Sequence, residues 1–309
     1  MISVIIVTYN SRQHIARCLE SLQGSGAEIV VVDNASADGT AELVRETIPG
    51  VKLIVSQRNL GFAGGANLGA QQSRGTALLF ANPDTVCHCS LTLLEDALER
   101  SPGIVAAAPR LVDAQGRTQT GFHLRRLPTM ASLIFEVLGI NRLFPNNPVN
   151  RRYRCLDLDP ALPAEVEQPA GAFLLVRRTS FESCGGFDDG FYPLWFDDVD
   201  LCLRLRRGGG RIVYCPEAVV EHSGAHSLES VSFSDRQVYW YRNLLYYVRK
   251  HFRFPAGVVI RAAVLMGIVL RLVAELPGLL MPSQTRTQAR GEKICAYWKA
   301  AKLSVSGWK

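Results

Sequence analysis

The chain has 309 residues and a net charge of +6, and 48% of it is hydrophobic. A chain of this length and composition buries a substantial core, which excludes an intrinsically disordered protein. The charge is uneven: residues 236–309 carry thirteen Lys and Arg against two Glu, a net +11, and the remainder carries −5. The basic C-terminal part therefore predicts an anionic partner, either lipid or nucleic acid.

The N-terminus and the cysteines indicate a cytoplasmic protein. No basic segment precedes the first apolar run at Ile2, so no secretory signal peptide is expected. The eight cysteines form no C-x-x-C pair, which is typical of reduced thiols. Cys87-His88-Cys89 resembles a metal motif, but structural zinc sites need more ligands at wider spacing, and a loop or helix start is the better interpretation.

Short apolar runs rich in β-branched residues alternate with helical patterns over the first hundred residues. The runs cover residues 3–7, 29–32, 51–55 and 77–81. Because they are almost continuously apolar, we expect strands covered by helices on both faces. This alternation predicts an α/β fold with a doubly wound, mostly parallel sheet.

The helical patterns between these runs begin with residues that favour helix N-termini. Asn10 or Ser11 is expected to cap the first helix, and Asp38 the second. Apolar residues at i, i+3, i+4 and i+7 place one face of the first helix against the core. These residues are Ile15, Cys18, Leu19 and Leu22.

Polar clusters follow three of the predicted strands, and ligands of such sheets bind at the carboxyl ends of the strands. The clusters comprise Thr8, Tyr9 and Asn10 after the first strand, Asp33 and Asn34 after the second, and Asn82, Pro83 and Asp84 after the fourth. Asn-Pro-Asp alone is a common turn. Beside the other two clusters, Asp84 is instead a candidate ligand for Mg²⁺ or Mn²⁺, which prefer oxygen donors and substrate phosphates.

Three acids stand together at Asp197, Asp198 and Asp200, where a helix is predicted to begin. Acids at a helix N-terminus also favour the helix dipole, and Asp200 is spaced to pair with Arg204 on the surface. Asp197 and Asp198 point in other directions, so one of them can face a cleft. Next to Trp195, such a carboxylate would have a raised pKa and could act as a general base.

Two further features have both structural and functional interpretations. His222 follows a strand-like run, and a single histidine is more often structural than a ligand. The Gly-rich stretch at residues 59–69 permits a ligand to approach the backbone closely. It is neither a G-x-G-x-x-G motif nor a P-loop, which disfavours a dinucleotide or ATP.

The order of the motifs resembles that of family 2 glycosyltransferases with the GT-A fold, and most closely rhamnosyltransferase-like enzymes of cell-surface polysaccharide synthesis. The matching segments are VTYN (7–10), VDNASADGT (32–40), NLGFAGGANLG (59–69), NPD (82–84), QPAGAFLLVRR (168–178), GGFDDGFYPLWFDDVDLCLRLRRGG (185–209) and VVEHSG (219–224). The resemblance covers about the first 250 residues. It implies an inverting transfer of a sugar such as L-rhamnose from dTDP-rhamnose.

The resemblance also assigns roles to individual residues. Asp198 matches the family's catalytic base, with Asp197 where many relatives carry Glu. Asp84 takes the metal-ligand place of the D-x-D motif, Asn82 replaces its first Asp, and His222 matches a histidine that completes the metal shell in some members. The residues expected to contact the nucleotide-sugar donor are Thr8, Tyr9, Asn10, Asp33, Asn34, Asn59, Gly61, Asn67 and Asn82.

Two domains are expected. Residues 1–234 form the catalytic domain, with a nucleotide-sugar-binding half (1–105) and an acceptor and catalytic half (106–234). Within it, residues 125–163 are expected to form a loop or small helical insertion. Residues 235–309 form a basic, apolar helical segment.

The C-terminal segment predicts contact with a membrane surface. Residues 256–281 are apolar, but Arg261, Arg271 and Glu275 interrupt them, so an interfacial helix is expected on the anionic inner face of the membrane. A lipid-linked acceptor, such as a polyprenyl-diphosphate-linked saccharide, would be presented there. The alternative is an ordinary core helix, in which the two arginines would be awkward.

Other functions remain open at this point. A non-catalytic nucleotide-sugar-binding module would keep the strand-end clusters but would not need the acids at residues 197 and 198. A nucleotidyltransferase, or a transferase using a UDP-sugar, would share the sheet and the metal. A nucleic-acid-binding protein is disfavoured, because the basic tail lacks the aromatic interleaving typical of such proteins.

Overall fold

The computed structural model describes residues 1–224, 231–275 and 284–305. The chain forms two compact units. The first unit contains residues 1–127 and 154–227, and the second contains residues 128–153 and 228–309. The expected boundary at residue 234 assigned the segment 128–153 to the catalytic domain, whereas the structure groups it with the C-terminal helices.

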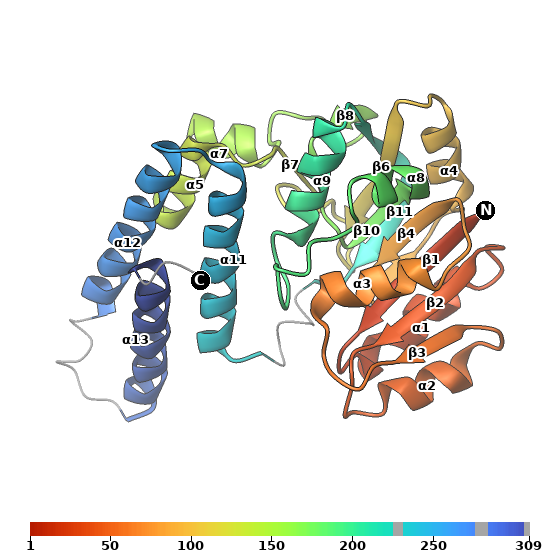
Figure 1. The fold of residues 1–309 in the computed structure, drawn as a ribbon, viewed down its shortest axis with the longest axis horizontal. Coiled ribbons are helices and arrows are strands. Elements are labelled where there is room, and N and C mark those ends of the chain that lie inside the picture. Colours follow the sequence, from red (N-terminus) through yellow and green to blue (C-terminus); the bar gives the residue numbers. More distant parts are fainter. Residues whose placement is uncertain (225–230, 276–283, 306–309) are drawn as a thin grey trace. The chain divides into compact units, whose positions relative to one another are not determined.

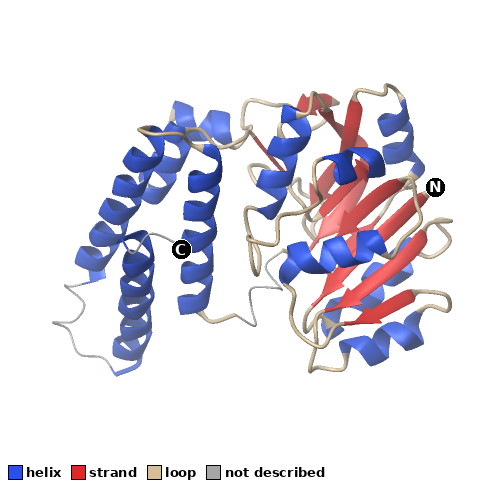
Figure 2. Ribbon diagram, viewed as in Figure 1, coloured by secondary structure: helices blue, strands red, loops and turns tan. Residues whose placement is uncertain are grey.

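The first unit is an α/β layer structure with helices on both faces of one sheet (Figures 1 and 2). Its elements are β1 (Ile2–Thr8), α1 (Arg12–Leu22), β2 (Glu28–Asp33), α2 (Thr40–Thr47), β3 (Lys52–Val55), α3 (Gly61–Gln71), β4 (Ala77–Ala81), β5 (Thr85–Cys87), α4 (Thr92–Glu99), β6 (Ile104–Val112), β7 (Leu124–Arg125), β8 (Ala164–Val166), β9 (Gln168–Pro169), β10 (Phe173–Arg177), α8 (Arg178–Ser183), α9 (Asp197–Arg207) and β11 (Arg211–His222).

The sheet is mixed and has nine strands in the order β3-β2-β1-β4-β10-β6-β11-β5, with β8 paired to β11. β1, β2, β3 and β4 are parallel to their neighbours within this group, and β10 runs antiparallel between β4 and β6. Thr8 pairs with Asp33 in the register of β1 and β2, so the two lie side by side where these strands end. The predicted doubly wound α/β sheet is confirmed.

Successive residues of β1 face the two opposite cores, because side chains alternate along a strand. Val4 and Ile6 pack in the core that contains α1, α2 and α4, including the four α1 residues predicted to face inwards. Ile5 and Val7 pack in the core that contains α3, α8 and α9. All seven residues of β1 are buried, as expected for a strand covered on both faces.

The first helix is capped differently from the prediction. Ser11 is its N-cap residue, but the Ser11 side chain makes no capping hydrogen bond. Asp38 instead accepts hydrogen bonds from the backbone N–H groups of Arg12 and Thr40, which begin α1 and α2. One carboxylate thus satisfies the N-termini of two helices.

Helix α3 lies very close to β1 because of its glycines. A Cβ atom at Gly65 would stand 2.7 Å from Val7, and one at Gly69 would stand 2.5 Å from Ile5. Real Cβ atoms do not approach so closely, so only glycine permits this packing. The glycines within the 59–69 stretch therefore have a packing function at these two positions.

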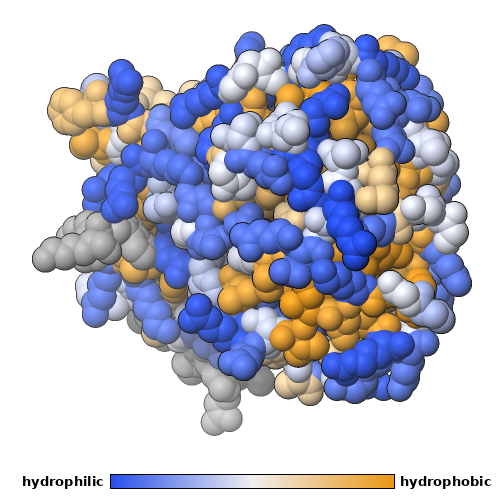
Figure 3. All heavy atoms as spheres, turned by 45° about the vertical axis from the view of Figure 1, so that its right-hand side comes forward, coloured by the Kyte–Doolittle hydropathy of each residue, from blue (hydrophilic) through white to orange (hydrophobic). Residues whose placement is uncertain are grey.

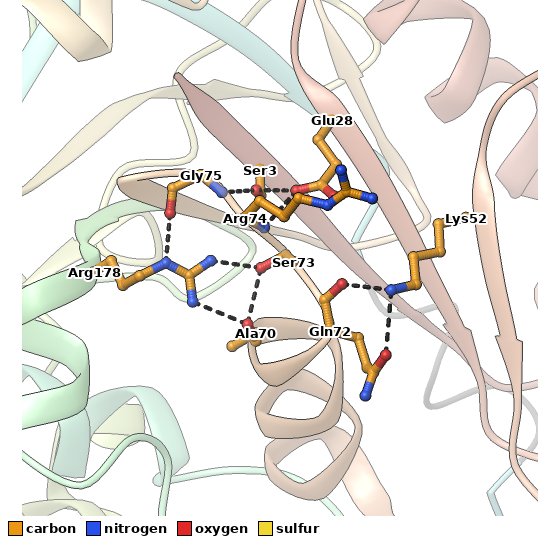
Figure 4. A network of polar contacts seen from close by, with 9 residues as sticks. All are labelled: Ser3, Glu28, Lys52, Ala70, Gln72, Ser73, Arg74, Gly75 and Arg178. Carbon is orange, nitrogen blue, oxygen red and sulfur yellow. Dashed lines mark hydrogen bonds and ion pairs between the residues drawn. The ribbon is translucent and has the colours of Figure 1, made fainter.

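A polar network fixes the loop from α3 to β4 at the end of the sheet opposite the polar clusters (Figure 4). The Arg178 guanidinium donates hydrogen bonds to the carbonyl oxygens of Ala70 and Gly75. Gly75 N–H donates to Ser3 Oγ, and Ser3 Oγ donates to Glu28 at the start of β2. The network satisfies both backbone polar groups of Gly75 and adds a hydrogen bond at the end of α3.

The second unit is helical and contains α5 (Met130–Val137), α6 (Ile140–Leu143), α7 (Pro148–Tyr153), α11 (Phe233–His251), α12 (Ala256–Glu275) and α13 (Gln284–Val305). A Cβ atom at Gly267 of α12 would stand only 2.1 Å from the carbonyl oxygen of Val137, so α5 packs directly onto α12 at this glycine. Arg271 donates hydrogen bonds to the same Val137 oxygen and to Gly267 O. This contact explains why residues 128–153 belong to the helical unit.

Figure 3 shows one face of the molecule, on which hydrophilic side chains surround apolar ones that gather below and to the right of the centre of the view. More than half of the accessible surface of a typical folded protein is apolar, so such a mixture carries no functional information by itself.

Candidate active site

The carboxyl ends of β1 and β2 bring the hydroxyl of Thr8 and the carboxylate of Asp33 together. Thr8 Oγ1 donates a hydrogen bond of 2.9 Å to Asp33 Oδ1, and Ser36 donates to both oxygens of Asp33. Thr8 and Asp33 are almost fully buried. These bonds hold the loop after β2 in one conformation.

The neighbouring residues complete a polar surface around these strand ends. Asn34 is buried, and its side-chain amide donates a hydrogen bond of 3.0 Å to Gly61 O. Asn59 Oδ1 accepts the Gly61 N–H at 2.8 Å. Tyr9 is 42% exposed, and Asn10, with φ of 51°, accepts a hydrogen bond from the loop after β2. The structure thus brings seven of the nine residues predicted for the donor together at one edge of the sheet.

Asn67 has a different environment. Its side chain donates to Phe187 O and Asp189 Oδ1 and accepts the Phe187 N–H, at 2.8–2.9 Å. Both ends of the amide are therefore engaged by the loop before α9. Asn67 fixes this loop, which leads to the three acids.

Asp84 and His222 meet as the resemblance implies. β5 pairs with the end of β11, with Thr85 opposite His222. His222 Nε2 lies 3.7 Å from Asp84 Oδ2, and both side chains are at most 5% exposed. Asp84 Oδ1 is buried and has no hydrogen-bond partner among the described residues. Burial lowers the pKa of His222, although the Asp84 carboxylate opposes this effect.

This pair fits a divalent cation. A neutral imidazole and a carboxylate with an unsatisfied oxygen are suitable ligands for Mg²⁺ or Mn²⁺. Within the described part of the chain, no group of three Asp, Glu, His or Cys side chains is placed to hold a metal. Such cations are usually bound by one or two protein ligands together with substrate phosphates, so two ligands are sufficient.

The three acids begin α9 after two strained residues. Trp195 and Phe196 have φ values of 76° and 68°, a left-handed conformation that costs of order 1–3 kcal/mol for non-glycine residues. Asp198 Oδ2 accepts hydrogen bonds from Gly171 N–H at 3.0 Å and Gln168 Nε2 at 3.3 Å. The strained turn and these two donors together fix the position of the Asp198 carboxylate.

Burial raises the pKa of both neighbouring carboxyls. Desolvation is the main cause for Asp197, and the adjacent Asp198 charge adds to it. Desolvation also raises the pKa of Asp198, while the Gly171 hydrogen bond and the nearby Arg125 charge oppose the rise. A carboxylate with a raised pKa is a better proton acceptor, as a general base requires.

Asp200 pairs with Arg204, as its spacing predicts, but the pair is not on the surface. Arg204 Nε lies 2.7 Å from Asp200 Oδ2, and the Asp200 side chain is fully buried. The helix turns this acid towards the core because it is two positions after Asp198. Asp200 is therefore a structural residue.

The loop 170–172 links the base to the metal pair. Asn82 N–H donates to Ala172 O at 2.8 Å, and Gly171 N–H donates to Asp198. The Asp84 carbonyl oxygen accepts the Ser223 N–H, next to His222. The two parts of the site are thus connected through the backbones of neighbouring loops.

The sequence did not predict four residues that contact the groups of this site. Gln168 and Gly171 lie in the segment QPAGAFLLVRR, but nothing in their type indicated contact with Asp198. Gln119 and Phe122 contact His222: Gln119 through hydrogen bonds, and Phe122 through a stacked ring with centroids 5.3 Å apart. No sequence signal pointed to these two, because they lie in an irregular segment.

The sequence is similar to the sequences of known proteins. The chain matches the family described as Glycosyl transferase family 2 over residues 3–162, and Glycosyltransferase like family 2 over residues 148–243. It is 32% identical to the N-acetylglucosaminyl-diphospho-decaprenol L-rhamnosyltransferase of Mycobacterium tuberculosis, over 74% of this chain and 77% of that protein. It is 25% identical to rhamnosyltransferase WbbL of Escherichia coli, over 78% and 89% of the two chains.

Solved structures agree on the fold. The mannosyltransferase PcManGT of Pyrobaculum calidifontis, in complex with GDP-Man and Mn²⁺, superposes with a TM-score of 0.56 at 18% identity, covering 99% of this chain and 88% of that one. GalNAc-T7 with UDP, GalNAc and Mn²⁺ gives a TM-score of 0.53 at 19% identity, over 72% and 43% of the chains. The mixed sheet and the helices that cover it therefore have the GT-A fold. The sequence places the protein more narrowly: the chain belongs to glycosyltransferase family 2.

Proposed function

We propose that this protein is a metal-dependent, inverting glycosyltransferase that moves L-rhamnose from dTDP-rhamnose to a hydroxyl of a saccharide acceptor in cell-surface polysaccharide synthesis. The observation that carries the proposal is the Asp198 carboxylate. It is held by Gly171 and Gln168 and has a raised pKa. The loop that holds it also contacts the loop carrying Asp84.

The mechanism assigns a proton transfer to Asp198. The acceptor hydroxyl attacks the anomeric carbon from the face opposite the leaving nucleoside diphosphate, and Asp198 takes up the hydroxyl proton. Proton transfer of this kind is typically worth about 10²–10⁴ in rate. Asp84 and His222 would hold Mg²⁺ or Mn²⁺, which supplies Lewis-acid stabilisation of the diphosphate charge. Asp197 keeps Asp198 in place by accepting its backbone N–H.

The donor lies, in this proposal, along the ends of β1, β2 and β4. Tyr9 offers an exposed ring for the base, and Asp33 and Asn34 line the loop beside it. Gly61 has φ of 73° and stands so close to Tyr192 that no side chain would fit. The N–H groups of Gly61 and Phe62 donate to Asn59 Oδ1 and Pro193 O, so the start of α3 holds the neighbouring loops in place. Asn82 is partly exposed next to Asp84 and is placed to contact the donor.

The acceptor we propose is a polyprenyl-diphosphate-linked saccharide. The name of the M. tuberculosis relative specifies such an acceptor, N-acetylglucosaminyl-diphospho-decaprenol. An acceptor of this kind is anchored in a membrane, so the enzyme must work at a lipid surface. We therefore propose a cytoplasmic enzyme bound peripherally to the inner face of the cell membrane.

Helix α12 supports the membrane proposal with a continuous apolar face. Of the described helices, α12 is the one long and apolar enough to cross a membrane by length and composition. Its buried side consists of Ile260, Val264, Gly267 and Ile268. Its opposite side exposes aliphatic residues at helical spacing, which are Val258, Val259, Met266, Val269, Leu270 and Val273.

Of the charged residues that interrupt this helix in sequence, Arg271 and Glu275 are half-buried and turn towards neighbouring helices, whereas Arg261 is exposed. Arg271 donates to carbonyl oxygens on the side packed against α5, and Glu275 pairs with Lys293 of α13. Arg261 donates to Ser304 O of α13. The two arginines were expected to be awkward in a packed helix, but each of them donates a hydrogen bond to a backbone carbonyl oxygen of a neighbouring helix. Packing on one side favours a helix that lies on the bilayer over one that spans it.

The charge around α12 favours an anionic lipid surface over a protein partner. Arg249, Lys250 and Arg253 are exposed just before the helix, and Phe254 beside them is 85% exposed. Each basic side chain near an anionic leaflet is worth about 1 kcal/mol. Protein interfaces rely on aromatic and polar anchors with a polar rim, whereas this face is purely aliphatic.

Liposome co-sedimentation tests whether the exposed aliphatic face of α12 binds an anionic lipid surface. Wild type is expected to bind vesicles more strongly as their anionic lipid content rises, and more weakly in high salt. Val269→Glu places a charge on the face and should abolish binding. Val55→Glu, on the edge strand β3 of the first unit, is the matched control because Val55 is 49% exposed and Val269 is 51% exposed. Equal binding of both variants, or wild type remaining in the supernatant, would refute the membrane proposal.

A donor and acceptor screen tests the enzymatic proposal. Purified protein with Mn²⁺ is incubated with a panel of nucleotide sugars and a short polyprenyl-diphosphate-GlcNAc acceptor. We expect transfer from dTDP-rhamnose with inversion at the anomeric carbon. Turnover of a UDP-sugar instead would change the donor, and donor binding by thermal shift without any transfer would indicate a non-catalytic binding module.

A further inference from the structure

Gln119 makes a two-point contact with His222 that fixes its chemistry. Gln119 Nε2 donates a hydrogen bond of 2.7 Å to the backbone carbonyl oxygen of His222, and Gln119 Oε1 lies 3.0 Å from His222 Nδ1. A carbonyl oxygen only accepts hydrogen bonds, so the amide nitrogen must face it. The amide oxygen then faces the ring, and Nδ1 must carry the proton.

The other ring nitrogen consequently presents a lone pair. In a neutral imidazole with Nδ1 protonated, Nε2 is an acceptor. Nε2 faces Asp84 Oδ2 at 3.7 Å, which is too long for a hydrogen bond. Two acceptors face each other, and Asp84 Oδ1 has no partner among the described residues. His222 Nε2 and the Asp84 carboxylate would together hold a divalent cation, which would supply the positive partner that these acceptor atoms need.

Gln119 is itself held firmly. Its backbone N–H donates to Leu111 O of β6, and its carbonyl oxygen accepts the N–H groups of Phe122 and His123. Phe122 stacks on the His222 ring at an interplanar angle of 8°. The ring is thus fixed at its edge by Gln119 and at its face by Phe122.

We propose that Gln119 is a positioning residue for the divalent cation, because it holds His222 in the tautomer whose Nε2 lone pair faces Asp84. This inference rests on the proposed metal site and adds to it the group that prepares the ligand. Partners of this kind fix the orientation of a metal-bound histidine, and their loss typically weakens metal binding about 10–100-fold.

The test measures the tautomer and the metal affinity separately. Long-range ¹H–¹⁵N spectra of the metal-free protein report which ring nitrogen is protonated, and the His222 signal is assigned by its absence in His222→Asn. We expect the Nδ1–H form in wild type and its loss in Gln119→Met. Mn²⁺ binding, followed by electron paramagnetic resonance with dTDP or UDP present, should be about 10–100-fold weaker in Gln119→Met.

Two further variants keep the proposal falsifiable. Gln119→Glu retains an acceptor for Nδ1–H, so it should keep the tautomer and bind Mn²⁺ better than Gln119→Met. Gln115→Met is the matched control, because Gln115 is exposed in the same region and its side chain accepts from Arg117. This control should match wild type in both measurements.

The outcomes separate this inference from the proposed function. An Nε2–H tautomer in wild type, or wild-type Mn²⁺ affinity in Gln119→Met, overturns the role of Gln119 and leaves the metal site intact. Wild type that binds no Mn²⁺ with either nucleotide overturns the metal site and the inference together. Sugar transfer by that same protein would show that the transferase proposal survives without the metal.

Discussion

Replacing Gly171 by alanine tests how closely the base must be positioned. An added Cβ would stand 2.9 Å from Asp198 Cβ and 3.5 Å from Asp198 Oδ2. Carbon atoms in contact prefer about 3.5–4.0 Å, so Asp198 or the loop must move by roughly 0.6–1 Å. A misplacement of about 1 Å costs up to about 10²-fold in rate, so kcat should fall by one to two orders of magnitude, while the donor KM changes little.

The assay compares steady-state transfer and thermal unfolding of Gly171→Ala with those of Gly291→Ala. Gly291 lies in α13 with nothing within 4 Å of an added Cβ, so the same substitution there should leave kcat unchanged. Overpacking at Gly171 typically costs about 1–3 kcal/mol of stability, which a lower Tm would record. Unchanged kcat in Gly171→Ala with an unchanged Tm would refute the role of Gly171 in positioning Asp198.

The remaining predictions concern the charged groups of the site. Asp84→Ala should abolish EDTA-sensitive transfer without loss of fold, and Asn82→Ala should reduce it less; full activity of the first variant at ordinary Mn²⁺ concentration contradicts the metal assignment. Asp198→Asn should lower kcat by about 10² or more with donor affinity retained. Asp200→Asn should chiefly lower stability, by about 3–5 kcal/mol in denaturant titration, because it leaves a largely buried arginine unpaired; the reverse ranking in kcat would show that the two roles are misassigned. Arg125→Met removes a charge that lowers the pKa of Asp198, so the acid limb of the kcat/KM profile should move to higher pH, and an unmoved or lowered limb would exclude Asp198 as the titrating base.

The sequence predicted the sheet well because buried strands appear as short continuous apolar runs and the helices between them appear as apolar residues at helical spacing. The runs at 29–32 and 77–81 lie within β2 and β4, and α1 buries the four residues that its spacing indicated. Periodicity gives no information where the chain is irregular, so it did not show that the segment 128–153 packs with α12. That contact depends on Gly267, whose partner Val137 is far away in sequence.

The sequence also predicted the candidate residues of the site, because carboxylates and a histidine at strand and helix ends are visible as residue types. It did not identify the residues that hold these groups in place. Gln119 and His222 are 103 positions apart, and Gly171 is 27 positions from Asp198. In the sequence, the charged residues of α12 interrupt an apolar segment. Only the structure shows that Arg271 points away from the exposed face and donates to a backbone carbonyl oxygen of α5. Residue types determine which chemistry is available, but orientation and support come from contacts between distant segments, and only the folded chain makes those contacts.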